Sequence, residues 1–176
     1  MRYLRGTKEL PLILSAESTN IVKWWVDGSY GIHPDARSQT GGTASLGKGS
    51  FMSTLIKQRL NTRSSKETEL VAADDLMPHL CWTNYFLECQ GYDVHSTIMY
   101  QDNQLEILLE KNGRSSSSKR TKHLNIRYFF ITDRIKKGDI HIEYCPTDNT
   151  VATFFTKPLQ SKKLLQFRRL IMNLQD

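Results

Sequence analysis

The strongest constraint on the fold is an apolar run at residues 22–30, VKWWVDGSY, which ends in an acid and then in turn-forming residues. Its β-branched and aromatic residues predict a strand, and the Asp27-Gly28 pair marks the end of that strand. Other functional residues are therefore sought among those that can approach Asp27.

Two further strand-like segments follow the first one, at residues 43–46 and 51–60. The Gly-Lys-Gly triplet at residues 47–49 between them is typical of a hairpin turn. Three successive strands joined by short connections predict an antiparallel meander at the start of the fold.

From residue 64 onward the apolar residues recur at helical spacing, and Ser64 and Glu67 have the spacing of a capping box. The helix is expected to end at Gly91 and to be kinked or interrupted at Pro78. A strand at residues 94–100 follows it. Because a strand–helix–strand unit crosses over, this fourth strand is expected to lie parallel to the first.

The second half of the chain continues to alternate between helix and strand. We expect a short helix near residues 105–109, an amphipathic helix at 121–136, a fifth strand at 139–144, one or two helical turns at 151–155, and a C-terminal helix after residue 158. The pattern predicts an α/β fold with a five-stranded mixed sheet and flanking helices.

Composition and charge set further limits on location and partners. A chain of 176 residues with 39% hydrophobic residues can form one compact domain, and its net charge of +6 suits a polyanionic partner. Cys81, Cys89 and Cys145 form no Cys-x-x-Cys pair, so reduced thiols and an intracellular location, cytoplasmic or nuclear, are expected. No apolar run approaches the roughly 20 residues of a membrane span, so no membrane partner is expected.

Three acids lie where regular elements begin or end. Asp27 ends the first strand, Glu69 lies near the start of the long helix, and Asp102 follows the fourth strand. If the first and fourth strands are parallel neighbours, these acids meet at one edge of the sheet. Crowded carboxylates suit Mg²⁺ or Mn²⁺. Each acid also has a structural alternative, as a turn residue, a first-turn helix acid and a helix cap respectively.

Several short sequence motifs, called phrases below, surround these acids and follow one another along the chain. They are VDGS at 26–29, RSQTG at 37–41, KQ at 57–58, SSKETELVA at 64–72, DNQ at 102–104, RTKH at 120–123 and FTKPL at 155–159. Together they resemble the ribonuclease H domain of copia-type retrotransposon polyproteins. By this resemblance residues 1–20 are the end of a reverse transcriptase region, 21–156 a ribonuclease H-like domain, and 157–176 a C-terminal amphipathic helix.

The resemblance implies an endoribonuclease that hydrolyses the RNA strand of an RNA/DNA hybrid with two Mg²⁺ or Mn²⁺ ions. Asp27 would bridge both ions, Glu69 would hold the ion on the leaving group, and Asp102 would complete the metal-binding set. Glu67 competes with Glu69 for the second role, but the capping box gives Glu67 a structural one.

One position departs from the family. The Ala-Asp pair that usually precedes FTKPL is Ala152-Thr153 in this chain. Because threonine offers only a neutral hydroxyl, the second ion is expected to bind more weakly and the activity to fall or vanish. Asp148, in a nearby loop, is a candidate substitute, although its surroundings are typical of a turn. The alternative function is an inactive nucleic-acid-binding or structural remnant of the polyprotein.

Substrate contacts are expected from two sources. Residues 111–137 contain nine Lys or Arg residues and one acid, which suits tracking of a phosphate backbone, although a solvated helix face explains the same charges. The resemblance adds six contacts with the hybrid: Ser29, Asn103, Gln104, Arg120, Lys122 and His123. Besides the hybrid, the reverse transcriptase region of the same polyprotein is an expected partner. Trp24, Trp25 and Trp82 are interpreted as core residues rather than base-stacking platforms.

Overall fold

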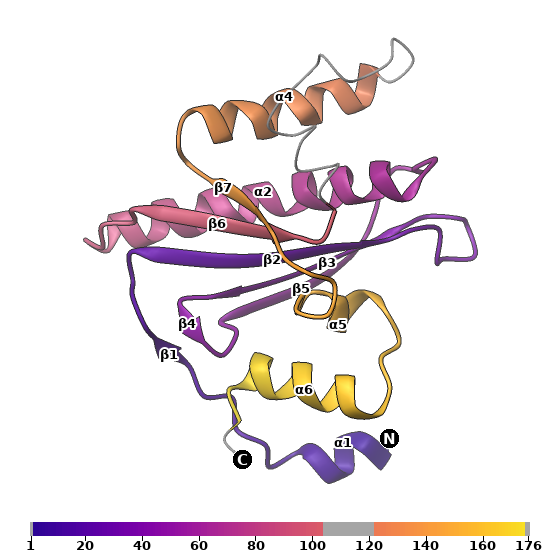
Figure 1. The fold of residues 1–176 in the computed structure, drawn as a ribbon, viewed down its shortest axis with the longest axis vertical. Coiled ribbons are helices and arrows are strands. Elements are labelled where there is room, and N and C mark those ends of the chain that lie inside the picture. The colour runs from indigo at the N-terminus through magenta and orange to yellow at the C-terminus, as the bar shows by residue number, and fades with distance from the viewer. Residues whose placement is uncertain (1, 104–121, 175–176) are drawn as a thin grey trace.

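The computed structural model of the chain describes residues 2–103 and 122–174. Its main sheet has five strands in the order β5-β3-β2-β6-β7. The helices α2 (Ser65–Cys89) and α4 (Lys122–Lys136) lie on one side of this sheet, and α5 (Thr153–Thr156) and α6 (Ser161–Met172) lie on the other (Figure 1). The described residues thus form the expected α/β architecture.

The pairing of the strands agrees with the predicted topology. β2 (Ile21–Ser29) pairs antiparallel with β3 (Gln39–Ser45), which pairs antiparallel with β5 (Met52–Lys57). β6 (Ser96–Gln101) is parallel to β2, and β7 (His141–Tyr144) is parallel to β6. The opening meander and the parallel crossover are both confirmed.

The boundaries of the second strand differ from the prediction. β3 begins at Gln39, before the predicted start at residue 43, and it includes Gly41 and Gly42, although glycine is typical of turns. These glycines permit close packing instead, because a Cβ atom on Gly42 would collide with Leu76 of α2. The predicted hairpin triplet also contributes β4 (Gly47–Lys48), which pairs with β1 (Ser15–Ala16) in a separate two-stranded sheet.

The long helix runs without interruption through Pro78, so the expected interruption is wrong, whereas the kink that was the other expectation stays a prediction. A helical proline removes one backbone donor, and the fully buried neighbours Leu76, Met77 and Leu80 hold the helix against the sheet. The capping box is half formed. The Ser64 hydroxyl accepts a hydrogen bond from the Glu67 amide at 3.2 Å, whereas the Glu67 carboxylate accepts one from the Arg63 amide.

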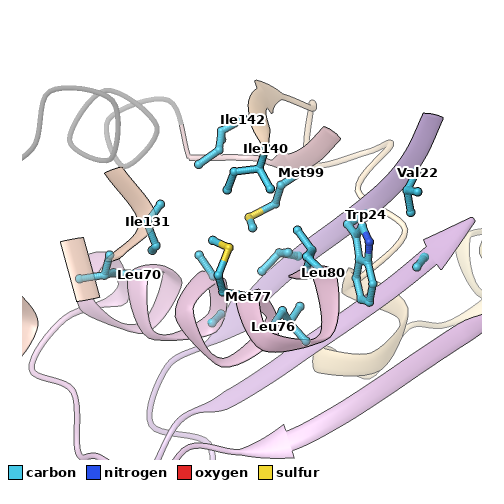
Figure 2. Close-up of a cluster of buried hydrophobic side chains, with 14 of the residues drawn as sticks. Val22, Trp24, Leu70, Leu76, Met77, Leu80, Met99, Ile131, Ile140 and Ile142 are labelled. Carbon is cyan, nitrogen blue, oxygen red and sulfur yellow. The ribbon is translucent and has the colours of Figure 1, made fainter. Parts of the chain in front are cut away.

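The core lies between the sheet and α2. Figure 2 shows Val22 and Trp24 of β2 and Met99 of β6 facing Leu76 and Met77 of α2. Alternate residues of β2 point to this face, which is why Trp24 is fully buried while Trp25 faces the opposite side.

The interpretation of the tryptophans as core residues holds only in part. Trp25 is half-buried and stacks on Tyr100 of the adjacent strand, with ring centroids 5.4 Å apart. Trp82 lies on the outer face of α2 with 63% of its side chain exposed, and it stacks on Phe86. The Trp82 expectation was wrong because the helical spacing of apolar residues does not show which of them face solvent.

The C-terminal helix is held by contacts with distant parts of the chain. The Ile13 amide donates to the Met172 carbonyl at 3.0 Å, and the Ser50 amide donates to the Ile171 carbonyl at 2.7 Å. Near the chain start, α1 (Arg2–Thr7) contributes Tyr3, whose hydroxyl lies 3.3 Å from Arg168. The proposed domain boundaries after residues 20 and 156 stay predictions.

Three remaining expectations concern the cysteines, membranes and the short helix near residues 105–109. The three cysteines are free, as expected. No helix in the described part of the chain is long and apolar enough to cross a membrane. The predicted helix near residues 105–109 lies outside the described residues.

We expect Leu76→Ala to lower the free energy of unfolding by about 2–5 kcal/mol, because it leaves a cavity between α2 and the sheet. Leu165→Ala is the matched control, since Leu165 lies on α6 with 45% of its side chain exposed. It should cost less than about 1 kcal/mol. Urea unfolding followed by circular dichroism measures both, and equal losses would contradict the assignment of the core.

Candidate functional site

Three acidic side chains meet at one edge of the sheet. Asp27 lies late in β2, Glu69 lies near the start of α2, and Asp102 directly follows β6. One carboxylate oxygen from each lies within 4.8 Å of the others. Their meeting follows from the parallel pairing of β2 with β6, which brings the carboxyl ends of both strands to the same edge.

Asp27 is fully buried, and both of its carboxylate oxygens have partners from one short segment. The Lys157 ammonium lies 3.2 Å from Oδ1, and the Thr156 hydroxyl donates to Oδ2. Burial raises the pKa of Asp27 and outweighs the opposing effects of these two partners, while the charge of Asp102 raises it further.

Glu69 is buried beside the backbone of β2. The Gly28 amide donates to its Oε2 at 3.1 Å. Gly28 allows this approach, because a Cβ atom there would lie 2.9 Å from Cγ2 of Thr68. Burial, followed by the charges of Asp27 and Asp102, raises the pKa of Glu69 well above its usual value.

Asp102 is half-buried and is held from the other side of the site. The Thr147 hydroxyl donates to its Oδ2 at 3.0 Å. The Cys145 amide donates to the Gln101 carbonyl at 2.7 Å, which fixes the loop after β7 beside the end of β6. The third acid is thus oriented by a loop from late in the chain.

A buried hydrogen-bond network supports the first turn of α2, next to Glu69. Gln58 is fully buried, and its side-chain nitrogen donates to the Thr40 hydroxyl and to the Thr68 carbonyl, both at 3.0 Å. Ser38 is hydrogen-bonded to the hydroxyls of Thr62 and Thr68 at 2.8 and 3.1 Å. The RSQTG and KQ phrases therefore contribute positioning residues, a role that residue spacing alone does not reveal.

The chemistry of this cluster fits a divalent cation. Two like charges 4 Å apart repel by about 4 kcal/mol at the effective dielectric typical of such positions. A hard cation relieves this repulsion, and carboxylate oxygens are the ligands that Mg²⁺ and Mn²⁺ prefer. Asp27, Glu69 and Asp102 are therefore the residues that could hold a metal ion.

The resemblance predicts a fourth acid at the position that Thr153 holds in this chain, and α5 carries both Thr153 and Thr156, the residue that contacts Asp27. Thr153 begins α5, only one helical turn before Thr156. Its side chain is buried, and its hydroxyl has no hydrogen-bond partner among the described residues. Asp148, the candidate substitute, lies outside the acidic cluster, and its side chain is 91% exposed and pairs with Lys163. Glu67 is also outside the acidic cluster.

The expected substrate contacts are only partly described. Ser29 ends β2 with its side chain nearly buried, and Asn103 is half-buried next to Asp102. Gln104 and Arg120 lie outside the described residues. Lys122 and His123 lie in the first turn of α4, but their side chains lie outside the described part. The roles of all six residues stay predictions.

Several basic residues of the 111–137 segment have structural partners. Arg127 pairs with Asp74 of α2 and lies 3.8 Å from Asp75. Arg134 pairs with Asp139 at 3.0 Å, and Lys137 pairs with Asp133 at 2.8 Å. These pairs favour a structural role for this part of the segment.

The chain was then compared with known proteins. No protein-family model matches it. It is 29% identical over 174 residues to the retrovirus-related Pol polyprotein from transposon TNT 1-94 of Nicotiana tabacum, an alignment that covers 97% of this chain and 13% of the relative. It is 28% identical to the corresponding polyprotein from transposon RE2 of Arabidopsis thaliana, with coverage of 97% and 12%.

Two solved structures share the fold. LC11-RNase H1, isolated from compost, matches with a TM-score of 0.53 at 14% identity, over 76% of this chain and 91% of that one. The same enzyme in complex with an RNA/DNA hybrid matches with a TM-score of 0.55 at 12% identity, over 76% and 92%. The fold is that of ribonuclease H. Nearly the whole chain is homologous to a segment of copia-type Pol polyproteins, although it spans only about an eighth of the length of these relatives.

The crowding of acids at this edge of the sheet disfavours the ionised form of Glu69, which is buried. Because the pKa of Glu69 is raised in the folded state, its ionisation destabilises the fold as the pH rises above the usual value of 4.5. In buffer with a chelator, we expect Glu69→Gln to melt roughly 2–4 °C higher than the parent at about pH 8.

The matched control for this prediction is Glu88→Gln, at an exposed position near the end of α2. Thermal melts from about pH 5 to about pH 8 should show the Glu69→Gln advantage growing with pH, with no such trend for Glu88→Gln. A Glu69→Gln melting temperature equal to the parent's at every pH would contradict the burial of a charged group there.

Proposed function

We propose that the chain is a metal-dependent ribonuclease H that hydrolyses the RNA strand of an RNA/DNA hybrid. The observation that carries this proposal is the meeting of Asp27, Glu69 and Asp102 at one edge of a ribonuclease H sheet. Two comparisons support it: the homology to retrotransposon Pol polyproteins and the solved complex of a protein of this fold with a hybrid.

The three acids would hold Mg²⁺ or Mn²⁺, which supplies Lewis-acid stabilisation of charge and a lower pKa for the attacking water. The chain's own residues orient the ligands. The Gly28 amide fixes Glu69, and the Thr147 hydroxyl fixes Asp102. Mutation of residues that make such hydrogen bonds to metal ligands typically lowers metal affinity or activity by roughly 10–100-fold.

The polyprotein homology also indicates the source of the substrate. A reverse transcriptase makes RNA/DNA hybrids, so the reverse transcriptase region of the same polyprotein is the partner that we propose for this domain. The hybrid would lie across the edge where the three acids meet.

A second candidate function is binding of the hybrid without cleavage. Thr153 favours it, because a neutral and unpartnered hydroxyl stands where the family usually has an acid. The two functions differ in whether the remaining three acids suffice for hydrolysis.

The test is cleavage of a hybrid with a labelled RNA strand in the presence of Mg²⁺ or Mn²⁺. We expect the parent to cut the RNA strand. The cleavage rate of Asp27→Asn should be lower by more than roughly 100-fold, because this substitution removes a charge that holds the metal. Asp93→Asn is the control, because Asp93 is 83% exposed and precedes β6 at the opposite end of that strand.

Thr153→Asp extends the same assay. Restoring an acid should raise the rate of cleavage, because a fourth carboxylate strengthens the binding of cations at the site. No cleavage by the parent, together with cleavage by Thr153→Asp, would favour the second candidate function, which is binding of the hybrid without cleavage. Cleavage that is unaffected by Asp27→Asn would refute the proposed site.

A further inference from the structure

The feature that the metal site does not itself explain is Lys157. Its ammonium lies 3.2 Å from Oδ1 of Asp27, while the neighbouring Thr156 donates to the other oxygen of the same carboxylate. Asp27 is fully buried, and the Lys157 side chain is 41% exposed. The ammonium thus reaches from the surface to the most buried acid of the cluster.

The position of Lys157 is set by the packing of α5 on the sheet. Gly41 of β3 lies opposite Asp27 in the β2–β3 register. A Cβ atom on Gly41 would lie 2.5 Å from Cγ2 of Thr156 and 3.1 Å from the Ala152 carbonyl. Glycine at this position therefore lets α5 pack closely on β3, the strand next to β2. Lys157 comes directly after Thr156, and its extended backbone ends α5.

The charges of the site favour a single divalent ion. Asp27, Glu69 and Asp102 contribute three negative charges, and Lys157 contributes one positive charge, which leaves a net charge of −2. One divalent cation balances that charge. Four carboxylates would need two such cations, but at the position where the family resemblance predicts a fourth acid this chain has the neutral and buried Thr153.

We propose that this site holds one divalent ion. The Lys157 ammonium stays paired with the Asp27 carboxylate and supplies the positive charge that a second divalent ion would otherwise give. This inference rests on the proposed function and narrows it to a one-ion site. Lys157 acts on the metal site through Asp27, which makes it a positioning residue.

The test counts Mn²⁺ ions bound to the full chain without nucleic acid, by isothermal titration together with electron paramagnetic resonance of free Mn²⁺. The parent should bind one ion per chain. Lys157→Met should also bind one, with an affinity higher by about fivefold or more, because a repelling positive charge is gone. Fivefold corresponds to about 1 kcal/mol. Lys157→Arg keeps the charge and should bind like the parent.

A double variant tests the charge count directly. Thr153→Asp combined with Lys157→Met restores four acids without the ammonium and should bind two Mn²⁺ ions. Circular dichroism checks that each variant folds, and Lys157→Gln replaces Lys157→Met if the latter does not fold.

The outcomes separate this inference from the function on which it rests. A parent that binds no Mn²⁺ overturns the proposed metal-dependent function, and the inference with it. A parent that binds two ions overturns only the inference. One ion in the parent, with the same affinity in Lys157→Met, also overturns it, because the ammonium then has no influence on the ion.

Discussion

The mutual repulsion of three crowded carboxylates, two of which are buried, is the constraint on which the site depends. Burial raises the pKa values of Asp27 and Glu69, and the nearby charge of Asp102 raises both of them further. The chain offsets this cost only in part, through the Gly28 amide, the Thr156 and Thr147 hydroxyls and the Lys157 ammonium. In the proposed function, a bound divalent cation would offset the rest of this cost.

The scaffold holds the acids together with elements from the whole chain. Parallel β2 and β6 bring Asp27 and Asp102 to one edge, and the buried Gln58 fixes the first turn of α2 beside them. Gly28 of β2 lets α2 approach one side of the sheet, and Gly41 of β3 lets α5 approach the other side. Packing and hydrogen bonds around the acids thus account for residues of the RSQTG, KQ and FTKPL phrases.

Much of this arrangement could be predicted from the sequence. The apolar run ending at Asp27, the change of period at residue 64 and the parallel crossover were enough to place all three acids at one edge. The start of β3 was missed because glycines that signal turns also permit close packing, as Gly42 does against Leu76. The uninterrupted passage of α2 through Pro78 depends on tertiary packing. The contact of Lys157 with Asp27 joins residues 130 positions apart, and no local pattern encodes such a contact.

A crystal structure grown with Mn²⁺ tests the central claim most directly, because anomalous scattering locates the metal without regard to catalysis. The account predicts an anomalous density peak in contact with the carboxylates of Asp27, Glu69 and Asp102. Saturating Mn²⁺ with no peak at these three side chains, or with peaks only elsewhere on the chain, would contradict it.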